Sequence, residues 1–217
     1  MDKVTNGLNK LNAVLPLKER QDKVDPSIKK AHKAILTAYV EKGRTLSKGE
    51  LAKIVDNVDD AVKILNENDM VVFDKNNEPI GAYPFTMEQR EHKISVNGNL
   101  VHAMCALDSL GVSPMFDYEV EINSKCRVTG EPIKIKQKKL EILNPEENKD
   151  TKFGIIWAAA EGSCSCCANS LCMEMMYLKD GNVAEKWLAE DSKNREVYTL
   201  PEAVEFSSRF FAPLIKG

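Results

Sequence analysis

The stretch from Val101 to Leu110 constrains this chain most, because it places a thiol and a carboxylate inside an otherwise largely apolar run. Its sequence, Val-His-Ala-Met-Cys-Ala-Leu-Asp-Ser-Leu, predicts a helix ending near Gly111, with Cys105 and Asp108 on one face. A thiol and an acid so placed can bind a soft metal and move a proton. Taken alone, each residue has a commoner explanation, since such a cysteine is usually a small core residue.

Further cysteines later in the chain strengthen the functional interpretation of Cys105 and Asp108. The chain has 6 cysteines, and they lie at the following positions: Cys105, Cys126, Cys164, Cys166, Cys167 and Cys172. Adjacent cysteines such as Cys166 and Cys167 do not easily form a disulfide with each other, because the bridge would be strained. Thiols clustered in this way indicate soft-metal or redox chemistry in a reducing compartment.

Length and charge bound the remaining possibilities. The chain has 217 residues, enough for one large domain or two small ones, and 30 basic against 33 acidic residues. Because the charges nearly balance, the net charge does not indicate binding to nucleic acid or to a membrane surface. The N-terminal residues contain no continuous apolar run, so the sequence predicts neither a signal peptide nor a membrane span. We therefore expect a cytoplasmic protein.

Residues 1–84 are predicted to form a winged-helix-like N-terminal domain. Helices are expected over 27–42, from the Ser47–Glu50 capping box to residue 54, and from residue 57 or 59 onward, followed by a hairpin over 70–83. The third helix and the hairpin tip are acidic, whereas a domain that binds nucleic-acid phosphates needs Lys and Arg at these places. We therefore expect a structural or cap domain that does not bind nucleic acid.

Residues 85–217 are predicted to form a mixed or antiparallel sheet flanked by helices, which makes the whole chain an α+β protein. Expected strands cover residues 118–122, 132–143, 152–160 and 196–200, and expected helices cover 173–177, 182–190 and 201–211. Thr199 with Glu202 three residues later caps the last helix.

Four segments of this second half resemble the organomercurial (alkylmercury) lyase family. They are Met104-Cys-Ala-Leu-Asp-Ser-Leu, Asn123-Ser-Lys-Cys-Arg-Val-Thr-Gly-Glu-Pro, Ser165-Cys-Cys and Val197-Tyr-Thr-Leu-Pro-Glu-Ala, in the family's order. The similarity is strongest over roughly the last 130 residues. The chain departs from the family at Met104, where relatives often carry an aromatic residue, and after Cys167, where relatives can carry His.

The resemblance implies cleavage of a carbon–mercury bond without a cofactor. By motif, Cys105 matches the first thiol, Asp108 the acid and Cys166 the second thiol, and these three would hold mercury as substrate and as product. Cys167 is a further candidate mercury ligand, and Cys126 matches a cysteine that is structural in the family. Cys164 and Cys172 look like additional cysteines without an assigned role.

These residue types suit the reaction. Mercury(II) is soft, so thiolate is its preferred protein ligand, and each thiol must first lose its proton. Asp108 is placed to accept a proton from a thiol and to return it, as a general acid, to the carbon that leaves mercury. The products would be a hydrocarbon and thiol-bound Hg(II), which passes to small thiols or to a mercuric reductase.

Three alternatives remain open. The same lyase chemistry could act on another organometal or on an organoselenium-type bond. A thiol-based metal-responsive regulator or metal-binding module would explain clustered cysteines beside a winged-helix pattern, although the acidic helices count against it. Zinc could use the later cysteines, but structural zinc prefers paired Cys-x-x-Cys knuckles, and Cys-x-Cys-Cys-x4-Cys lacks that pattern.

Overall fold

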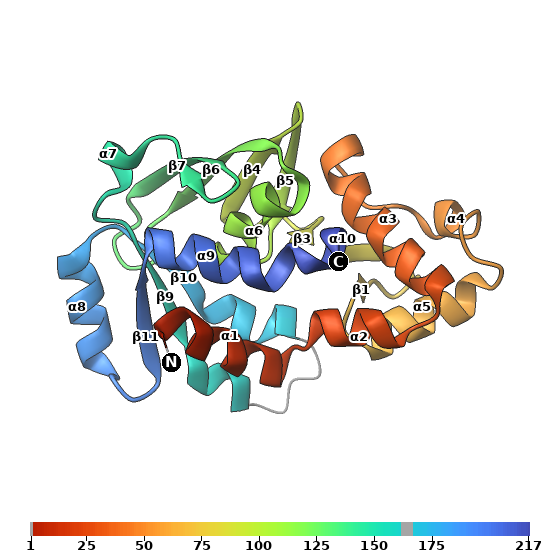
Figure 1. Cartoon of the computed structure of the whole chain (residues 1–217), viewed down its shortest axis with the longest axis horizontal. Helices are drawn as coiled ribbons and strands as arrows, with labels where there is room; N and C mark the ends of the chain where they lie inside the picture. Colours follow the sequence, from red (N-terminus) through yellow and green to blue (C-terminus); the bar gives the residue numbers. More distant parts are fainter. Residues whose placement is uncertain (1, 162–166) are drawn as a thin grey trace.

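The structure, a computed structural model, describes residues 2–161 and 167–217. Along the described chain a run of helices comes first, and the strands that follow are interrupted by further helices (Figure 1). The helices are α1 (Lys3–Val14), α2 (Leu17–Lys23), α3 (Pro26–Lys42), α4 (Lys48–Leu51), α5 (Val58–Glu67), α6 (Ala106–Phe116), α7 (Pro145–Asn148), α8 (Gly181–Glu190), α9 (Leu200–Phe211) and α10 (Pro213–Lys216). Three short 3-10 helices, η1 (Trp157–Glu161), η2 (Cys167–Asn169) and η3 (Leu171–Glu174), lie on either side of the undescribed residues.

Within the described residues the strands form two antiparallel sheets. The larger sheet has the order β1-β2-β3-β5-β4-β6-β7-β8 and the smaller has the order β10-β9-β11. The larger contains β1 (Val72–Phe73), β2 (Pro79–Ala82), β3 (Phe85–Thr86), β4 (His92–Val96), β5 (Asn99–Ala103), β6 (Glu119–Lys125), β7 (Pro132–Lys138) and β8 (Glu141–Ile142). The smaller contains β9 (Lys152–Ile156), β10 (Met175–Leu178) and β11 (Arg195–Thr199). This arrangement confirms the predicted α+β class with an antiparallel sheet flanked by helices.

Helix α6 lies at the centre of the molecule, packed against α9 (Figure 1). Every residue from Ala106 to Met115 is buried, so this helix is enclosed on all sides. Gly111 permits the close approach, because a Cβ there would lie 2.6 Å from the Phe211 ring. The Ser207 hydroxyl adds a hydrogen bond of 2.6 Å to the Leu107 carbonyl. The apolar run around Asp108 is therefore explained by burial of the whole helix.

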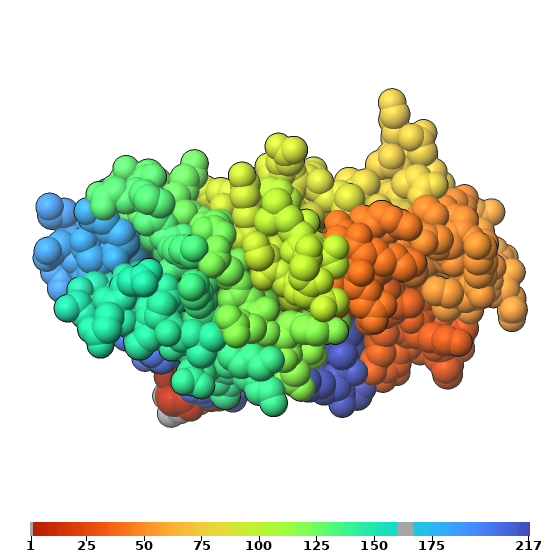
Figure 2. All heavy atoms as spheres, turned by 90° about the horizontal axis from the view of Figure 1, so that it is seen from above, coloured from red at the N-terminus to blue at the C-terminus, as the bar shows by residue number. Residues whose placement is uncertain are grey.

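The N-terminal helices and the hairpin continue directly into the rest of the molecule. Strands β2 and β3 pair at Gly81↔Thr86, so the larger sheet runs across the residue 84–85 boundary predicted between domains. Helix α1 packs on α9, near the other end of the chain. Figure 2 shows the N-terminal segment after α1 gathered at one end of the molecule, with the strands that follow α6 toward the other. The winged-helix-like assignment of residues 1–84 stays a prediction.

Three local predictions are wrong. The chain over 99–103 is strand β5, because it pairs with β4. The helix begins only after Cys105, and it runs to Phe116 because packing against α9 buries its later turns. The predicted helix over 173–177 is η3 followed by β10, whose residues pair with β9. The strand expected over 152–160 turns into η1 at Trp157, where the register with β11 ends at Arg195↔Ile156. Over residues 2–161 and 167–217, every helix is too short or too polar to span a lipid bilayer.

Candidate active site

The structure brings Cys105, Asp108 and Cys172 together. One ligand atom from each, a sulfur or a carboxylate oxygen, lies within 4.8 Å of the other two, and all three residues are buried. Cys105 and Asp108 come from the start of α6, whereas Cys172 comes from η3, which immediately precedes β10. Two thiols and one acid that meet in the core are groups that can hold a soft metal ion.

Cys105 caps α6 instead of lying within it. Its backbone is extended, and its Sγ accepts a hydrogen bond of 3.4 Å from the Asp108 backbone N–H. A sulfur at the N-cap lies close to the unpaired N–H groups of the first turn, which favour negative charge. The predicted proximity of Cys105 and Asp108 is confirmed. The two residues are not both inside the helix, however, because Cys105 is the N-cap and Asp108 is the third residue of α6.

Burial tunes the acid to neutral pH. Asp108 is 1% exposed, and its Oδ2 has no hydrogen-bond partner among the described residues. Removal from water disfavours the charged carboxylate and raises the pKa of Asp108 from 3.8 to about 7, against the weaker opposing effects of Cys105 and Arg90. A group that titrates near neutral pH can both take and give a proton at little cost.

Burial acts on the thiols in the same direction. It raises the pKa of Cys105 to about 11, and the neighbouring Asp108 carboxylate adds to this effect. Hydrogen bonding with Cys105, together with Cys167 and burial, raises the pKa of Cys172 well above its ordinary value. Both thiols therefore hold their protons at neutral pH, so a metal must displace those protons and a nearby base must receive them.

Residues of the N-terminal half hold the segment that carries the later cysteines. The Asp69 carboxylate accepts a hydrogen bond of 3.1 Å from the Cys167 backbone N–H. The Tyr83 hydroxyl accepts one of 2.7 Å from the Ala168 backbone N–H and donates to Asp69 at 3.2 Å. These contacts join the β1–β2 region to η2, so the predicted cap domain helps to position the site.

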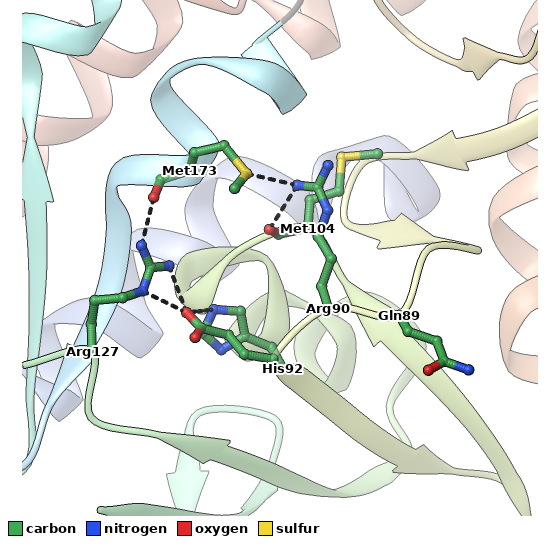
Figure 3. A pocket seen from close by; sticks show the side chains of 7 residues that line it. Gln89, Arg90, His92, Met104, Arg127 and Met173 are labelled. Atoms are coloured by element: carbon green, nitrogen blue, oxygen red, sulfur yellow. Dashed lines mark hydrogen bonds and ion pairs between the residues drawn. The ribbon is translucent and has the colours of Figure 1, made fainter. Parts of the chain in front are cut away.

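Two arginines hold the same segment from the surface, around a hollow of about 280 Å³ (Figure 3). The Arg90 guanidinium donates to the carbonyls of Met104 and Ala168, at 3.2 Å each. Arg127 donates to the Met173 carbonyl at 2.9 Å and pairs with Glu91. Since Met104 precedes Cys105 and Met173 follows Cys172, the hollow lies beside the backbone that carries both thiols.

The site also borders an apolar cavity of about 10 Å³. Its described lining includes Asp108, Cys167 and Cys172 together with the following largely apolar side chains: Leu11, Leu15, Tyr83, Phe210 and Phe211. A space of this size corresponds to roughly one water molecule, and a cavity with an apolar lining stays dry. The cavity offers a dry environment next to the acid, with helices α1 and α9 as two of its walls.

Cys126 lies apart from this cluster. It is fully buried, forms an isolated bridge with Tyr177, and its carbonyl accepts the Gly130 N–H at 2.9 Å within the turn between β6 and β7. Hydrogen bonds from Thr129 and neighbouring backbone N–H groups outweigh the effect of burial and lower its pKa. Its contacts with the turn and with β10 agree with the structural role that the resemblance implies.

The predicted second thiol, Cys166, lies outside the described residues, as does Cys164. Cys172, for which the sequence analysis predicts no role, is the thiol that the structure places beside Cys105 and Asp108. The Ser165-Cys-Cys motif favours Cys166 instead, because it matches the family pattern. One signal could have identified it, namely its position just before the apolar run Met175–Leu178, which reads as a buried strand ending at the core.

The fold and the site define an α+β protein with a buried two-thiol, one-carboxylate centre. The family model for MerB, alkylmercury lyase, matches residues 85–212, and the chain belongs to that family. Alkylmercury lyases of Bacillus cereus and Clostridium butyricum are each 26% identical over 148 residues, 68% of this chain and 65% of each relative. The chain thus matches slightly under two thirds of the length of these relatives.

A solved structure shares the fold. The mercury-bound form of MerB2 superposes with a TM-score of 0.72 at 23% sequence identity, covering 91% of this chain and 98% of that one. The family match contains α6, η3 and α9, and therefore every described residue of the thiol–carboxylate centre.

Proposed function

We propose that this protein is an organomercurial lyase that cleaves the carbon–mercury bond of R–Hg⁺ by protonolysis. The observation that carries the proposal is the meeting of Cys105, Asp108 and Cys172 within 4.8 Å in the core. Membership of the alkylmercury lyase family supports the assignment of mercury as the element. A metal trap needs soft ligands only, whereas a lyase also needs a proton donor aimed at the metal-bound carbon, and Asp108 provides one.

The reaction transfers one thiol proton to carbon and releases the other. The first thiol binds R–Hg⁺ and releases its proton to solvent. As the second thiol binds, Asp108 takes its proton, and the added thiolate raises electron density on mercury and weakens the carbon–mercury bond. Asp108, with a pKa of about 7, then gives the proton to the departing carbon. The products are R–H and Hg(II) held by two thiolates, and Asp108 returns to its starting state.

We assign the two thiolates to Cys105 and Cys172. Cys166 remains a candidate for the second position on the motif alone. The two assignments differ in a measurable way, because Cys172→Ser and Cys166→Ser cannot both abolish the reaction if one thiol supplies the second ligand. Serine keeps the approximate size of the side chain but offers a hard oxygen that mercury binds poorly.

The apolar cavity provides a place for the organic group. Its lining includes Asp108 and Cys172, so a carbon bound to mercury at the two thiols would lie close to the acid. With only about 10 Å³ free, the cavity favours a small alkyl group such as methyl over an aryl group, which requires the surrounding side chains to move.

The proposed reaction uses no cofactor, and Hg(II) leaves on small thiols or a mercuric reductase of the cytoplasm, where thiols stay reduced. We further propose that nucleic acid is not a partner, because α5 carries Asp59, Asp60 and Glu67 against Lys63. An anisotropy titration with DNA at low salt should show no site-specific complex. A tight, salt-sensitive complex would favour the regulator alternative.

The test of function is direct. The protein is incubated with methylmercury or phenylmercury and excess thiol, and methane or benzene is measured together with bound mercury. The proposal predicts one hydrocarbon for each R–Hg⁺ consumed, and predicts that Cys105→Ser nearly abolishes release. Tight mercury binding without hydrocarbon would instead indicate a metal-binding module or a lyase for another organometal or organoselenium-type bond.

A further inference from the structure

A third thiol, Cys167, lies beside the proposed active site without a part in the reaction. Its Sγ is 3.7 Å from the Sγ of Cys172, and both are free thiols. Cys172 therefore has two sulfur neighbours, Cys105 within 4.8 Å and Cys167 on its own segment. One thiol shared by two possible partners is an arrangement that could pass a metal ion from one pair to the other.

The spacings suit a soft ion at either pair. A metal–thiolate bond is about 2.3 Å long for zinc, so two thiolates on one ion lie up to roughly 4.6 Å apart. Both sulfur pairs fall close to this range. Each cysteine pair also lies in an apolar, buried setting, where soft thiolates are the best available ligands for mercury.

The position of Cys167 is fixed by the surrounding structure. Its backbone N–H is held by Asp69, and the next N–H, of Ala168, is held by Tyr83. Exposure of the three thiols rises from 1% at Cys105 to 4% at Cys172 and 6% at Cys167. Cys167 is thus held next to the shared thiol and is the least enclosed of the three.

We propose that Cys167 is the exit ligand for Hg(II), which moves after bond cleavage from the Cys105–Cys172 pair to the Cys172–Cys167 pair. The inference rests on the proposed function, since it concerns that reaction's product. In the exchange, the Cys167 sulfur loses a proton and bonds to mercury, the bond between mercury and Cys105 breaks, and the Cys105 sulfur takes up a proton. Mercury stays Hg(II) throughout, and no oxidant or reductant is needed.

The three thiols would then have different roles in the reaction and in product release. Transfer returns Cys105 to its protonated form and removes the metal from Asp108 before any external acceptor arrives. The acceptor, a small thiol or a protein dithiol, then meets mercury at the pair that includes the least enclosed cysteine. The shared ligand Cys172 keeps the ion bound at every stage, so toxic Hg(II) is not released free.

The test is equilibrium binding of Hg(II) alone, measured under reducing conditions by competition with a small dithiol. All proteins carry Cys164→Ser and Cys166→Ser, so that these thiols cannot substitute. In this background we compare Cys105→Ser, Cys167→Ser, Cys172→Ser and the double variant Cys105→Ser/Cys167→Ser. Cys126→Ala is the matched control for loss of a buried thiol outside the cluster, and circular dichroism checks that each protein is folded.

The expected result is that Cys105→Ser keeps a tight 1:1 site through Cys172 and Cys167. Adding Cys167→Ser to it should weaken binding by about 100-fold or more, because mercury loses one of two soft ligands. Cys172→Ser should be as weak as the double variant, and the control should match the background. In crystals of Cys105→Ser, anomalous scattering should place mercury between Cys172 and Cys167.

Equal affinities of Cys105→Ser and the double variant would overturn the inference, whether both are tight or both are weak. Cys167→Ala in place of Cys167→Ser keeps the comparison possible if the serine variant does not fold. Failure of the proposed function would look different, because the wild-type protein, with all its thiols, would then bind mercury without releasing hydrocarbon from R–Hg⁺. The two ideas can therefore fail separately.

Discussion

Asp108→Asn tests the buried acid most sharply, since asparagine keeps the shape of the side chain and does not ionise. Burial raises the pKa of Asp108 from 3.8 to about 7, so the folded protein binds this proton more tightly than the unfolded chain does. Its contribution to stability is therefore fully present below about pH 4 and is lost as pH rises toward 7. At about 1.4 kcal/mol per pKa unit, the loss amounts to roughly 4 kcal/mol at pH 7 and above.

The Asp108→Asn variant does not lose this stability as pH rises, because asparagine does not ionise. We expect the variant's unfolding free energy, relative to wild type, to rise by roughly 4 kcal/mol between pH 4 and pH 8. Urea titrations across this range measure the difference. Any cost of burying the amide is independent of pH, so the slope isolates the ionisation of Asp108.

Two buried histidines also change the stability with pH, but they do not affect this comparison. Burial lowers the pKa of His32 to about 4 and that of His92 to about 3, so both destabilise the folded protein as pH falls below 6.5. They are present in both proteins and cancel in the difference. A difference that stays constant from pH 4 to pH 8 would mean that Asp108 ionises as it does in water, and the argument for a neutral-pH proton carrier would be refuted.

The same variant separates capture from cleavage. An amide cannot accept a proton from a thiol or donate one to carbon at neutral pH. We expect Asp108→Asn to bind organomercurial on its thiols while hydrocarbon release falls by about 100- to 10,000-fold, the usual contribution of general acid–base catalysis. Bound mercury and hydrocarbon are measured in one sample, and wild-type release would remove Asp108 from the mechanism.

Three further predictions concern the groups around the acid. Cys172→Ser should nearly abolish hydrocarbon release while Cys166→Ser retains it, and the reverse pattern would assign the second thiol to Cys166. Tyr83→Phe removes the acceptor of the Ala168 N–H and should lower the free energy of unfolding by about 1–3 kcal/mol, measured by urea titration; an unchanged midpoint would show that this contact is unimportant. Leu15→Ala enlarges the apolar cavity and should raise the rate ratio of phenylmercury to methylmercury, whereas an unchanged ratio would place the organic group elsewhere.

Local signals in the sequence predicted local features well. The capping box of Ser47 with Glu50 opens α4, and that of Thr199 with Glu202 opens α9. Such signals succeed because both partners lie within one helical turn. The proximity of Cys105 and Asp108 is of the same kind, and it survives even though the helix begins one residue after Cys105.

The tertiary structure decided which thiol completes the site. Cys172 is far from Asp108 along the chain, and it arrives beside the acid because β10 pairs with β9 and packs on α6. No spacing rule encodes that meeting. The sequence instead favoured Cys166 through its Cys-Cys motif.

The chemistry of Asp108 was also decided by packing. Its residue type and place in the sequence are those of an ordinary helix aspartate, with a pKa near 3.8 in water. Helix α9 encloses the helix that carries it, the cavity walls exclude water, and the pKa rises to about 7. The sequence therefore specifies which groups are available, whereas folding sets their partners and protonation, because burial and long-range contacts exist only in the folded chain.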